Sequence, residues 1–190
     1  MGKKNKGKQT NVEENVVVSP ADLKHPLEYS WSLWVFLNEK TSWEDNLVRV
    51  AGFNTVEDFW CLYHHTKLPT ELKTGQDYLI FKESIEPIWE HPANKKGGRW
   101  IINFDKSKIS LDTLWLQLTL LMIGNNLVHN DIVCGAVVNS RTKSKISLWL
   151  SDGSSTKKLC AVGKELKKQL GRIIKLNFHL HTSSSNMLTL

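Results

Sequence analysis

The stretch Ile85–Trp100, IEPIWEHPANKKGGRW, sets a large aromatic ring beside a carboxylate between Pro87 and Pro92, in a segment that proline keeps from becoming a helix or a central strand. A proline lies on each side of the Trp89–Glu90 pair, and each proline fixes its own φ and removes a backbone donor. An aromatic face stacks on a nucleobase, and an ionised carboxylate only accepts hydrogen bonds. The pair therefore suits a base that is cationic on its face and a donor at its edge, such as a methylated guanine.

The other tryptophans favour this interpretation over the alternative, in which Trp89 fills a core and Glu90 is a solvated loop charge. Eight tryptophans in 190 residues are more than one core of this size needs, so some should lie at a surface. Trp43 is the best example, because it sits in NEKTSWEDN among polar and charged neighbours. We expect Trp43 to be a second, partly exposed stacking residue.

Length and composition indicate one globular domain. With 41% hydrophobic and 23% charged residues, 190 residues suffice for a substantial core. We expect a disordered basic leader over residues 1–24 and a single domain over residues 25–190 that ends in a short flexible tail. No apolar run approaches the roughly 20 residues that span a bilayer. The net charge of +6 and the pI near 9.2 are compatible with an anionic partner.

The cysteines and histidines do not predict a catalytic or metal site. Cysteines at positions 61, 134 and 160 form an odd set without a CxxC pair, which predicts buried, reduced thiols in an intracellular protein. Cys61 with His64 or His65 is a possible metal or thiol pair, but no second ligand cluster accompanies it. No clustered carboxylates, and no nucleophile with its base, stand beside the tryptophan loops. We therefore expect no enzyme, no cofactor and no metal.

Hydrophobic periodicity predicts an α+β fold with three helices. The first strand shows the pattern most clearly, because Trp31 and Leu33 alternate with Trp34 and Phe36, so both faces should be covered. The expected strands are residues 31–37, 47–53, 77–82, 99–104, 132–139, 146–150 and 173–178. The expected helices begin at Thr55, run over residues 111–123 between Ser110 and Gly124, and run over residues 161–170 before Gly171.

The segment SRTKSK carries three basic residues at alternate positions, Arg141, Lys143 and Lys145. In an extended chain they would point to one side about 6 to 7 Å apart, close to the spacing of successive phosphates. The alternative is a solvated basic turn. With two tryptophan loops elsewhere in the chain, phosphate binding is the better interpretation.

Five segments in order closely resemble the eukaryotic translation initiation factor 4E family: HPLEYSWSLW, TSWEDNL, FNTVEDFW, EPIWEHPANKKGGRW and VCGAVVNSRTKSKISLW. The resemblance runs from about His25 to about His181. It implies an α+β fold in which a curved antiparallel sheet of about eight strands carries three helices on its convex face, like a cupped hand. It also implies a non-enzymatic protein that binds the 7-methylguanosine 5′ cap of mRNA.

The resemblance assigns roles to the residues singled out above. It implies that Trp43 and Trp89 sandwich the methylated guanine, that Glu90 accepts hydrogen bonds from its edge, and that Arg141 and Lys145 hold the phosphates. The implied cap-binding set is Trp43, Glu44, Trp89, Glu90, Arg99, Arg141, Lys143 and Lys145.

A second site is implied on the helical face, where the scaffold factor 4G and the repressive 4E-binding proteins dock a short helix. Val56 and Trp60 lie four residues apart on one predicted helix, as do Leu116 and Leu120 on another, so each pair presents one stripe. The alternative for Trp60 is that it closes the core. The implied partner-binding set is His25, Pro26, Val56, Trp60, Leu116, Gln117 and Leu120.

These implications lead to a specific hypothesis. We expect a monomer, within a larger initiation complex and without membrane contact, that recruits 4G to capped mRNA for cap-dependent translation. We expect it in the cytoplasm, with the nucleus as a second location. The alternative is a cap-binding repressor with weak scaffold binding, although tryptophan at both positions 31 and 43 favours the activator. A decapping hydrolase, a methyltransferase and a plain protein-interaction module are the competing classes.

Overall fold

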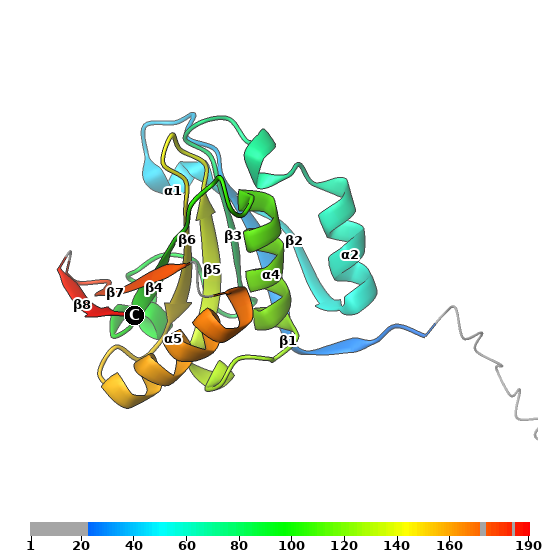
Figure 1. The fold of residues 1–190 in the computed structure, drawn as a ribbon. Coiled ribbons are helices and arrows are strands. Elements are labelled where there is room, and N and C mark those ends of the chain that lie inside the picture. The colour runs from blue at the N-terminus through cyan, green and yellow to red at the C-terminus, as the bar shows by residue number, and fades with distance from the viewer. Residues whose placement is uncertain (1–22, 172–173, 184) are drawn as a thin grey trace, which may run out of the picture.

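Eight antiparallel strands form one sheet within residues 23–171, 174–183 and 185–190, the part of the chain that the computed structural model describes (Figure 1). Their order across the sheet is β2-β1-β3-β5-β6-β4-β7-β8. The strands are β1 (Pro26–Phe36), β2 (Leu47–Thr55), β3 (Asp77–Lys82), β4 (Gly98–Asn103), β5 (Val133–Asn139), β6 (Lys145–Leu150), β7 (Lys175–Leu180) and β8 (Asn186–Thr189).

Three helices of ten or more residues lie on one side of this sheet (Figure 1). Thr55, Ser110 and Ser155 begin them, and each side chain accepts a hydrogen bond from an amide in the first turn. The predicted α+β fold, with about eight strands and three helices, is confirmed. The helices are α2 (Val56–His65), α4 (Leu111–Ile123) and α5 (Thr156–Leu170), with the short α1 (Trp43–Asn46) and α3 (Pro92–Lys95) and the 3-10 turns η2 (Pro69–Glu71) and η3 (Asn130–Ile132).

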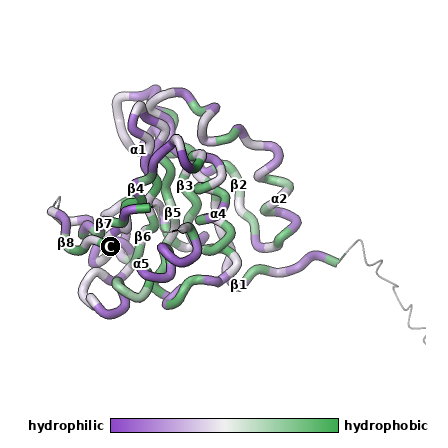
Figure 2. The backbone as a smooth tube through the Cα atoms, in the orientation of Figure 1, coloured by the Kyte–Doolittle hydropathy of each residue, from purple (hydrophilic) through white to green (hydrophobic). Residues whose placement is uncertain are grey.

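The sheet buries residues on both of its faces, and the central strands are accordingly hydrophobic along their length (Figure 2). Trp31 and Leu33 of β1 join the main core under the helices, whereas Trp34 and Phe36 pack with a smaller cluster on the opposite face. The predicted alternation of β1 is therefore confirmed. Because side chains alternate in a strand, one set of strands supports two chemically separate surfaces.

The Gly97–Gly98 pair is required by close packing and not only by a turn. A Cβ atom on Gly97 would collide with the carbonyl of Leu150, and one on Gly98 with the carbonyl of His179. Gly98 starts β4, which lies between β6 and β7. The two glycines thus let the segment after Trp89 enter the sheet directly.

Several sequence-based boundaries differ from the structure. Helix α5 begins at Thr156, five residues before the predicted start at 161, because Ser155 caps a lysine-rich first turn that has little apolar signal. The tail predicted to be flexible contains β8, which pairs antiparallel with β7. The prediction of three buried thiols holds only for Cys134, because Cys61 is exposed and Cys160 is half-buried. Cys61 lies on the outer side of an amphipathic helix, where its apolar neighbours gave a misleading signal.

The predicted leader, residues 1–24, falls almost entirely outside the described residues, which begin at Leu23. Lys24 is described, and its Nζ lies 2.6 Å from Asp58 Oδ1 of α2. The described part contains no helix that is long and apolar enough to cross a membrane.

Leu148→Ala tests the core beneath the sheet. Leu148 of β6 is fully buried, so truncation should lower the free energy of unfolding by roughly 2–5 kcal/mol. Leu68→Ala, at a side chain that is 37% exposed, is the matched control and should cost under about 1 kcal/mol. Urea titration of both variants measures the difference. Equal losses in the two variants would contradict the described packing.

Candidate functional site

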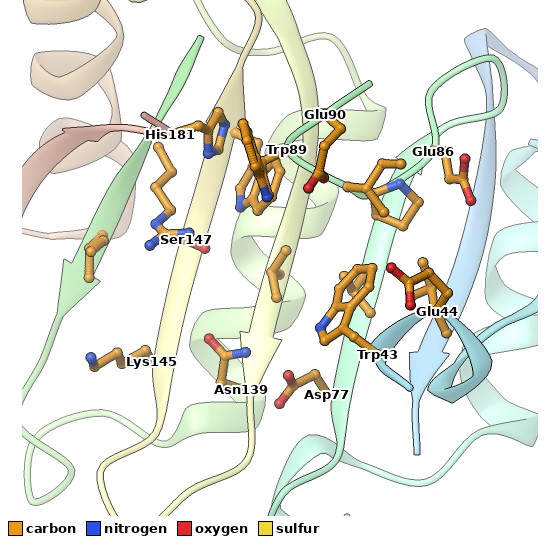
Figure 3. Close-up of a pocket in the computed structure, with 18 residues that line it drawn as sticks. Trp43, Glu44, Asp77, Glu86, Trp89, Glu90, Asn139, Lys145, Ser147 and His181 are labelled. Atoms are coloured by element: carbon orange, nitrogen blue, oxygen red, sulfur yellow. The ribbon is translucent and has the colours of Figure 1, made fainter. Parts of the chain in front are cut away.

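A cavity of about 820 Å³ opens on the face of the sheet opposite the long helices (Figure 3). Its floor is formed by the smaller apolar cluster, including Leu79, Val137 and Trp149. The structure brings six of the eight predicted cap-binding residues to its lining, from segments far apart in the sequence. They are Trp43, Glu44, Trp89, Glu90, Arg99 and Lys145.

Trp43 is held at the cavity by a buried asparagine that the sequence analysis did not single out. Asn46 is 2% exposed, and its Oδ1 accepts hydrogen bonds from the amides of Glu39 (2.7 Å) and Lys40 (2.8 Å). Its Nδ2 donates to the carbonyls of Lys40 and Ser42. One side chain thus closes the loop before α1, and Trp43 stays 45% exposed at its tip.

Trp89 is held in the same way by Asn94 of α3. The Asn94 side chain is fully buried, and its Nδ2 donates to the carbonyls of Glu86 (3.1 Å) and Ile88 (2.7 Å). His91 accepts a hydrogen bond from the Ala93 amide and so caps α3. Trp89 remains 47% exposed, in agreement with the prediction of a surface ring on an irregular loop.

Charges around the cavity are divided between two sides. Figure 3 shows Glu86 and Glu90 on one side, and Lys145 on the other. The acidic side offers a ligand hydrogen-bond acceptors, and the basic side offers hydrogen-bond donors and positive charge. The acidic lining residues are Glu44, Asp77, Glu86 and Glu90, and the basic ones are Arg99 and Lys145.

The basic segment after β5 is a turn and not the predicted extended comb. Asn139 pairs with Lys145 across the β5–β6 hairpin, so residues 140–144 must reverse the chain. The Ser144 hydroxyl donates to the carbonyl of Arg141 and closes this turn. Arg141, Lys143 and Lys145 nevertheless line one adjoining cavity of about 560 Å³. The predicted convergence of three cations therefore arises from turn geometry.

Arg141 is anchored by a carboxylate that the sequence analysis missed. Its guanidinium donates to both oxygens of Asp77, at 2.7 and 3.3 Å, and to the carbonyl of Ser140. Burial raises the pKa of the Asp77 carboxyl, although a hydrogen bond with Asn139 and the charge of Arg141 oppose this shift. The pair holds Arg141 where the two cavities adjoin.

A further cation approaches this turn from the loop after β4. Lys106 Nζ lies 3.4 Å from both the Thr142 carbonyl and the Ser144 hydroxyl. Lys106 had no sequence signal, because it lies about 36 residues before its contacts. It adds positive charge next to the Arg141–Lys145 turn.

The wall of the cavity formed by β4, β6 and the residue after β7 carries polar atoms without partners. Trp149 Nε1 and both ring nitrogens of His181 are buried and have no hydrogen-bond partner among the described residues. The His181 ring lies on Trp149, with ring centroids 4.1 Å apart. Burial, with a smaller effect from the charge of Arg99, lowers the pKa of His181 to about 4, so the imidazole is neutral at pH 7. A buried donor left unpaired costs roughly 1–3 kcal/mol.

The predicted partner-binding residues lie on the opposite, helical side of the sheet, where Val56 and Trp60 belong to α2, and Leu116, Gln117 and Leu120 belong to α4 (Figure 1). Val56 is 38% exposed, Gln117 is exposed, and both leucines are half-buried against the core.

Trp60 is only partly buried. Its indole packs against Phe59 and Tyr63 and stacks on His64, with ring centroids 5.1 to 5.8 Å apart. Trp60 therefore contributes to the edge of the core while one part of it stays at the surface. Trp60 is therefore not a fully buried core residue.

The start of β1 is tied to α2 by hydrogen bonds. His25 Nδ1 lies 2.7 Å from Glu57 Oε1, the His25 amide donates to Glu57 Oε2, and the Val56 amide donates to the His25 carbonyl. The bonds from His25 lower the pKa of Glu57 to about 2. His25 thus lies against the first turn of α2.

Cys61 and His65 contact each other within α2. His65 Nδ1 lies 2.7 Å from the carbonyl oxygen of Cys61, so this ring nitrogen is the donor. The distance from the same nitrogen to Cys61 Sγ is 3.9 Å. Within the described residues, no group of three His, Cys, Asp or Glu side chains is placed to hold a metal ion.

The structure thus places two exposed indoles and a carboxylate side at one cavity, and a cationic turn at the cavity beside it. The family model described as Eukaryotic initiation factor 4E matches residues 26–189. The chain therefore belongs to the eukaryotic initiation factor 4E family.

Individual relatives agree with this family. The chain is 48% identical over 163 residues to eukaryotic translation initiation factor 4E1 of Drosophila melanogaster, and the match covers 83% of the chain and 63% of that protein. Among solved structures, Ascaris suum eIF4E-3 with an m2,2,7G cap has a TM-score of 0.83 at 38% identity, covering 88% of this chain and 99% of that one. Caenorhabditis elegans eIF4E-3 with the 4E-binding protein Mextli and a cap analog has a TM-score of 0.82 at 38% identity, covering 88% and 100%.

His181→Phe tests the buried neutral imidazole. The unfolded chain binds a proton at His181 below about pH 6.5, whereas the folded state resists it until about pH 4, so wild type should lose stability as the pH falls across this window. Phenylalanine keeps a ring on Trp149 and does not titrate. The melting temperature of wild type, relative to the variant, should therefore fall between pH 7 and pH 4.5. A difference that is constant with pH would show that His181 titrates normally.

Proposed function

We propose that this chain binds the 7-methylguanosine 5′ cap of mRNA in the 820 Å³ cavity and recruits the scaffold factor 4G through its helical face. The observation that carries the proposal is the pair of half-exposed indoles, Trp43 and Trp89, on rigid loops at one cavity. Large aromatic rings that are half-exposed together beside one cavity indicate a binding site. Binding, and not catalysis, is the activity.

The two indoles can enclose a base between them. Methylation gives the guanine ring a positive charge, and an electron-rich indole face attracts a cation. The carboxylate of Glu90 accepts hydrogen bonds from the N1–H and the N2 amino group of guanine, which are donors with or without the methyl group. Adenine has a different edge and no such charge. Selectivity for methylated guanine thus follows from one charge and one set of donors.

The phosphates of the cap lie toward the cationic side. Lys145 belongs to both cavities, and Arg141 and Lys143 line the second one. Arg141 already donates to Asp77, so it approaches a phosphate in a fixed orientation and without a loss of rotamer entropy. Each phosphate contact should make the binding weaker as salt concentration rises.

The second activity uses the other side of the sheet. An amphipathic helix of 4G, or of a repressive 4E-binding protein, would lie across α2 and α4 and contact Val56, Trp60 and Leu120. The cap and Mextli complexes of the nematode relatives support both activities. We propose that the chain acts as a monomer within the initiation complex, in the cytoplasm and, as a second location, in the nucleus. The affinity for a 4G peptide distinguishes this function from the repressor alternative, which predicts weak binding of that peptide.

Trp31 supports this function only through the core. It is completely buried under the helices, so its presence favours an intact fold and says nothing about direct contact with a ligand. The activator interpretation therefore rests on Trp43 and on the helical face.

Trp43→Ala and Trp89→Ala test the sandwich. Each should weaken the binding of 7-methylguanosine triphosphate by about 1–3 kcal/mol, the usual loss for one stacking ring. Because the two rings share one base, the double variant should lose less than the sum, or reach the limit of the assay. Fluorescence titration with methylated and unmethylated GTP measures these losses. Trp115→Phe, a buried change on α4, is the control. Unchanged affinity in both single variants would rule out the sandwich.

Trp60→Ala tests the helical face. If Trp60 carries the contact with a partner helix, the variant should lose about 2 kcal/mol or more of affinity for a 4G peptide and keep its cap affinity. If Trp60 serves the core alone, the variant should lose stability and cap binding together. Melting temperature, cap affinity and peptide affinity on the same sample decide between them. Cys61→Ala, at the neighbouring exposed position, provides the control.

A further inference from the structure

We propose that helix α5 binds RNA: its outer side forms a cationic track that contacts phosphates of the capped message downstream of the cap, whatever their sequence. The track consists of Lys157, Lys164 and Lys168. The helix lies on the helical side of the sheet, at the outside of the molecule (Figure 1). This proposal rests on the proposed function, because it extends the contact with the same RNA beyond the cap.

The lysines of the track share the side of α5 that faces away from the core. At about 100° per residue, positions 157, 164 and 168 fall within about 40° of one another around the helix axis. All three side chains are exposed, and they lie about 10 Å and 6 Å apart along the axis. The buried residues of α5 that pack in the core occupy the opposite side, namely Leu159, Val162, Leu166 and Leu170.

Acidic side chains do not neutralise this helix. It contains five lysines and one glutamate, a net charge of +4 in a chain whose net charge is +6. The glutamate, Glu165, lies 3.5 Å from Lys168. Asp152, before the helix, accepts two hydrogen bonds within its own loop. Among the residues that the structure describes, no ion pair involves Lys157 or Lys164.

The lysines at the start of α5 also oppose the helix dipole. The N-terminal end of a helix carries a partial positive charge, which favours acidic residues there. The other two long helices follow this rule, because Glu57 and Asp58 lie in the first turn of α2 and Asp112 in that of α4. The first turn of α5 has no acid and contains Lys157 and Lys158. Helix stability therefore does not explain these lysines, whereas an anionic ligand does.

The chemistry of the track favours RNA over an acidic protein. Protein interfaces are depleted in lysine and take most of their binding energy from aromatic and other large anchors. Every residue of α5 is described, and none of its large hydrophobic side chains is exposed. Between Lys157 and Lys164 the same side carries only the small Ala161. Lysine binds a phosphate as a point charge, so such a track holds a nucleic-acid backbone without reading bases.

The message can reach α5 from the cap pocket around one end of the sheet. Strands β6, β4 and β7 are neighbours in that order. Lys145 begins β6, and the exposed Lys175 begins β7 and pairs with Asn103 at the end of β4. The two lysines therefore share one end of the sheet, about 10 Å apart across two strand spacings. Only four residues separate Lys175 from Leu170, where α5 ends. An RNA that leaves the pocket past Lys145 thus meets Lys175 and then the last turn of α5.

Capped uridine oligomers of about 3 and about 20 nucleotides test the track, because only the longer one can extend from the pocket over α5. Wild type should bind the long oligomer about tenfold more tightly than the short one at low salt. Lys157→Gln/Lys164→Gln should lose most of this gain and bind 7-methylguanosine triphosphate and the short oligomer within about twofold of wild type. Its salt slope for the long oligomer should fall by roughly 1.4, since each phosphate contact with a single strand contributes about 0.7. Fluorescence titration at several salt concentrations measures these values.

Two controls keep the test specific. Lys24→Gln/Lys67→Gln removes the same charge from exposed positions next to α2 and should keep the gain of the long oligomer. In the second control, a single 4-thiouridine is placed either next to the cap or about 10 nucleotides from it, and the complex is irradiated. Only the distant position should crosslink to a peptide from residues 156–170.

The proposal is overturned if wild type binds the two oligomers equally, if Lys157→Gln/Lys164→Gln keeps the gain, or if Lys24→Gln/Lys67→Gln loses as much. A labelled polyglutamate peptide is titrated on the same samples. If the α5 variant weakens the binding of this peptide and leaves the RNA gain unchanged, α5 is a site for an acidic protein and the proposal fails.

Failure of the proposed function looks different. In that case wild type would not distinguish the methylated from the unmethylated triphosphate. An uncapped long oligomer, titrated against wild type and Lys157→Gln/Lys164→Gln, would then still show whether α5 binds RNA.

Discussion

Two buried side-chain amides control the geometry on which the pocket depends. The Asn46 side chain forms hydrogen bonds with four backbone groups in the loop of Trp43. The Asn94 side chain donates to two carbonyls in the loop of Trp89. Neither loop has strand or long-helix structure to fix it. Asn46 donates and accepts at once, whereas Asn94 donates twice, and in each case one side chain supplies hydrogen bonds that an irregular loop lacks. The spacing of the two indoles thus depends on hydrogen bonds behind them.

The polarity of the pocket follows from where each wall originates. The acidic side is built from α1, the first residue of β3 and the loop of residues 86–90, and the donor side from β4, β6 and the residue after β7. A ligand with a positive ring and a negative tail can align with both sides only in one direction. Each contact is modest, but all of them favour the same orientation of the ligand. A small pocket can gain selectivity in this way without a large buried area.

The sequence alone predicted the elements with strong periodicity and the residues in unusual settings. Trp43 and Trp89 stood out because polar neighbours and prolines are incompatible with a core position. Asn46 and Asn94 could not be found this way, because an asparagine in a loop looks like any turn residue. Asp77 and His181 were missed for another reason: their roles come from contacts with residues distant in the chain. Strand β8 was not predicted, because its four residues give only a weak hydrophobic pattern.

The two-faced sheet also restricts how this chain can change in length. Alternate residues of β1 serve the helical core and the pocket floor, so inserting or deleting one residue within the strand would exchange the two sets of side chains. Both surfaces would then be lost in a single event. Length variation is tolerable only between strands, and the turn of residues 140–144 is one such place. Divergence in this protein should therefore proceed through substitutions in the strands and through insertions and deletions in the loops.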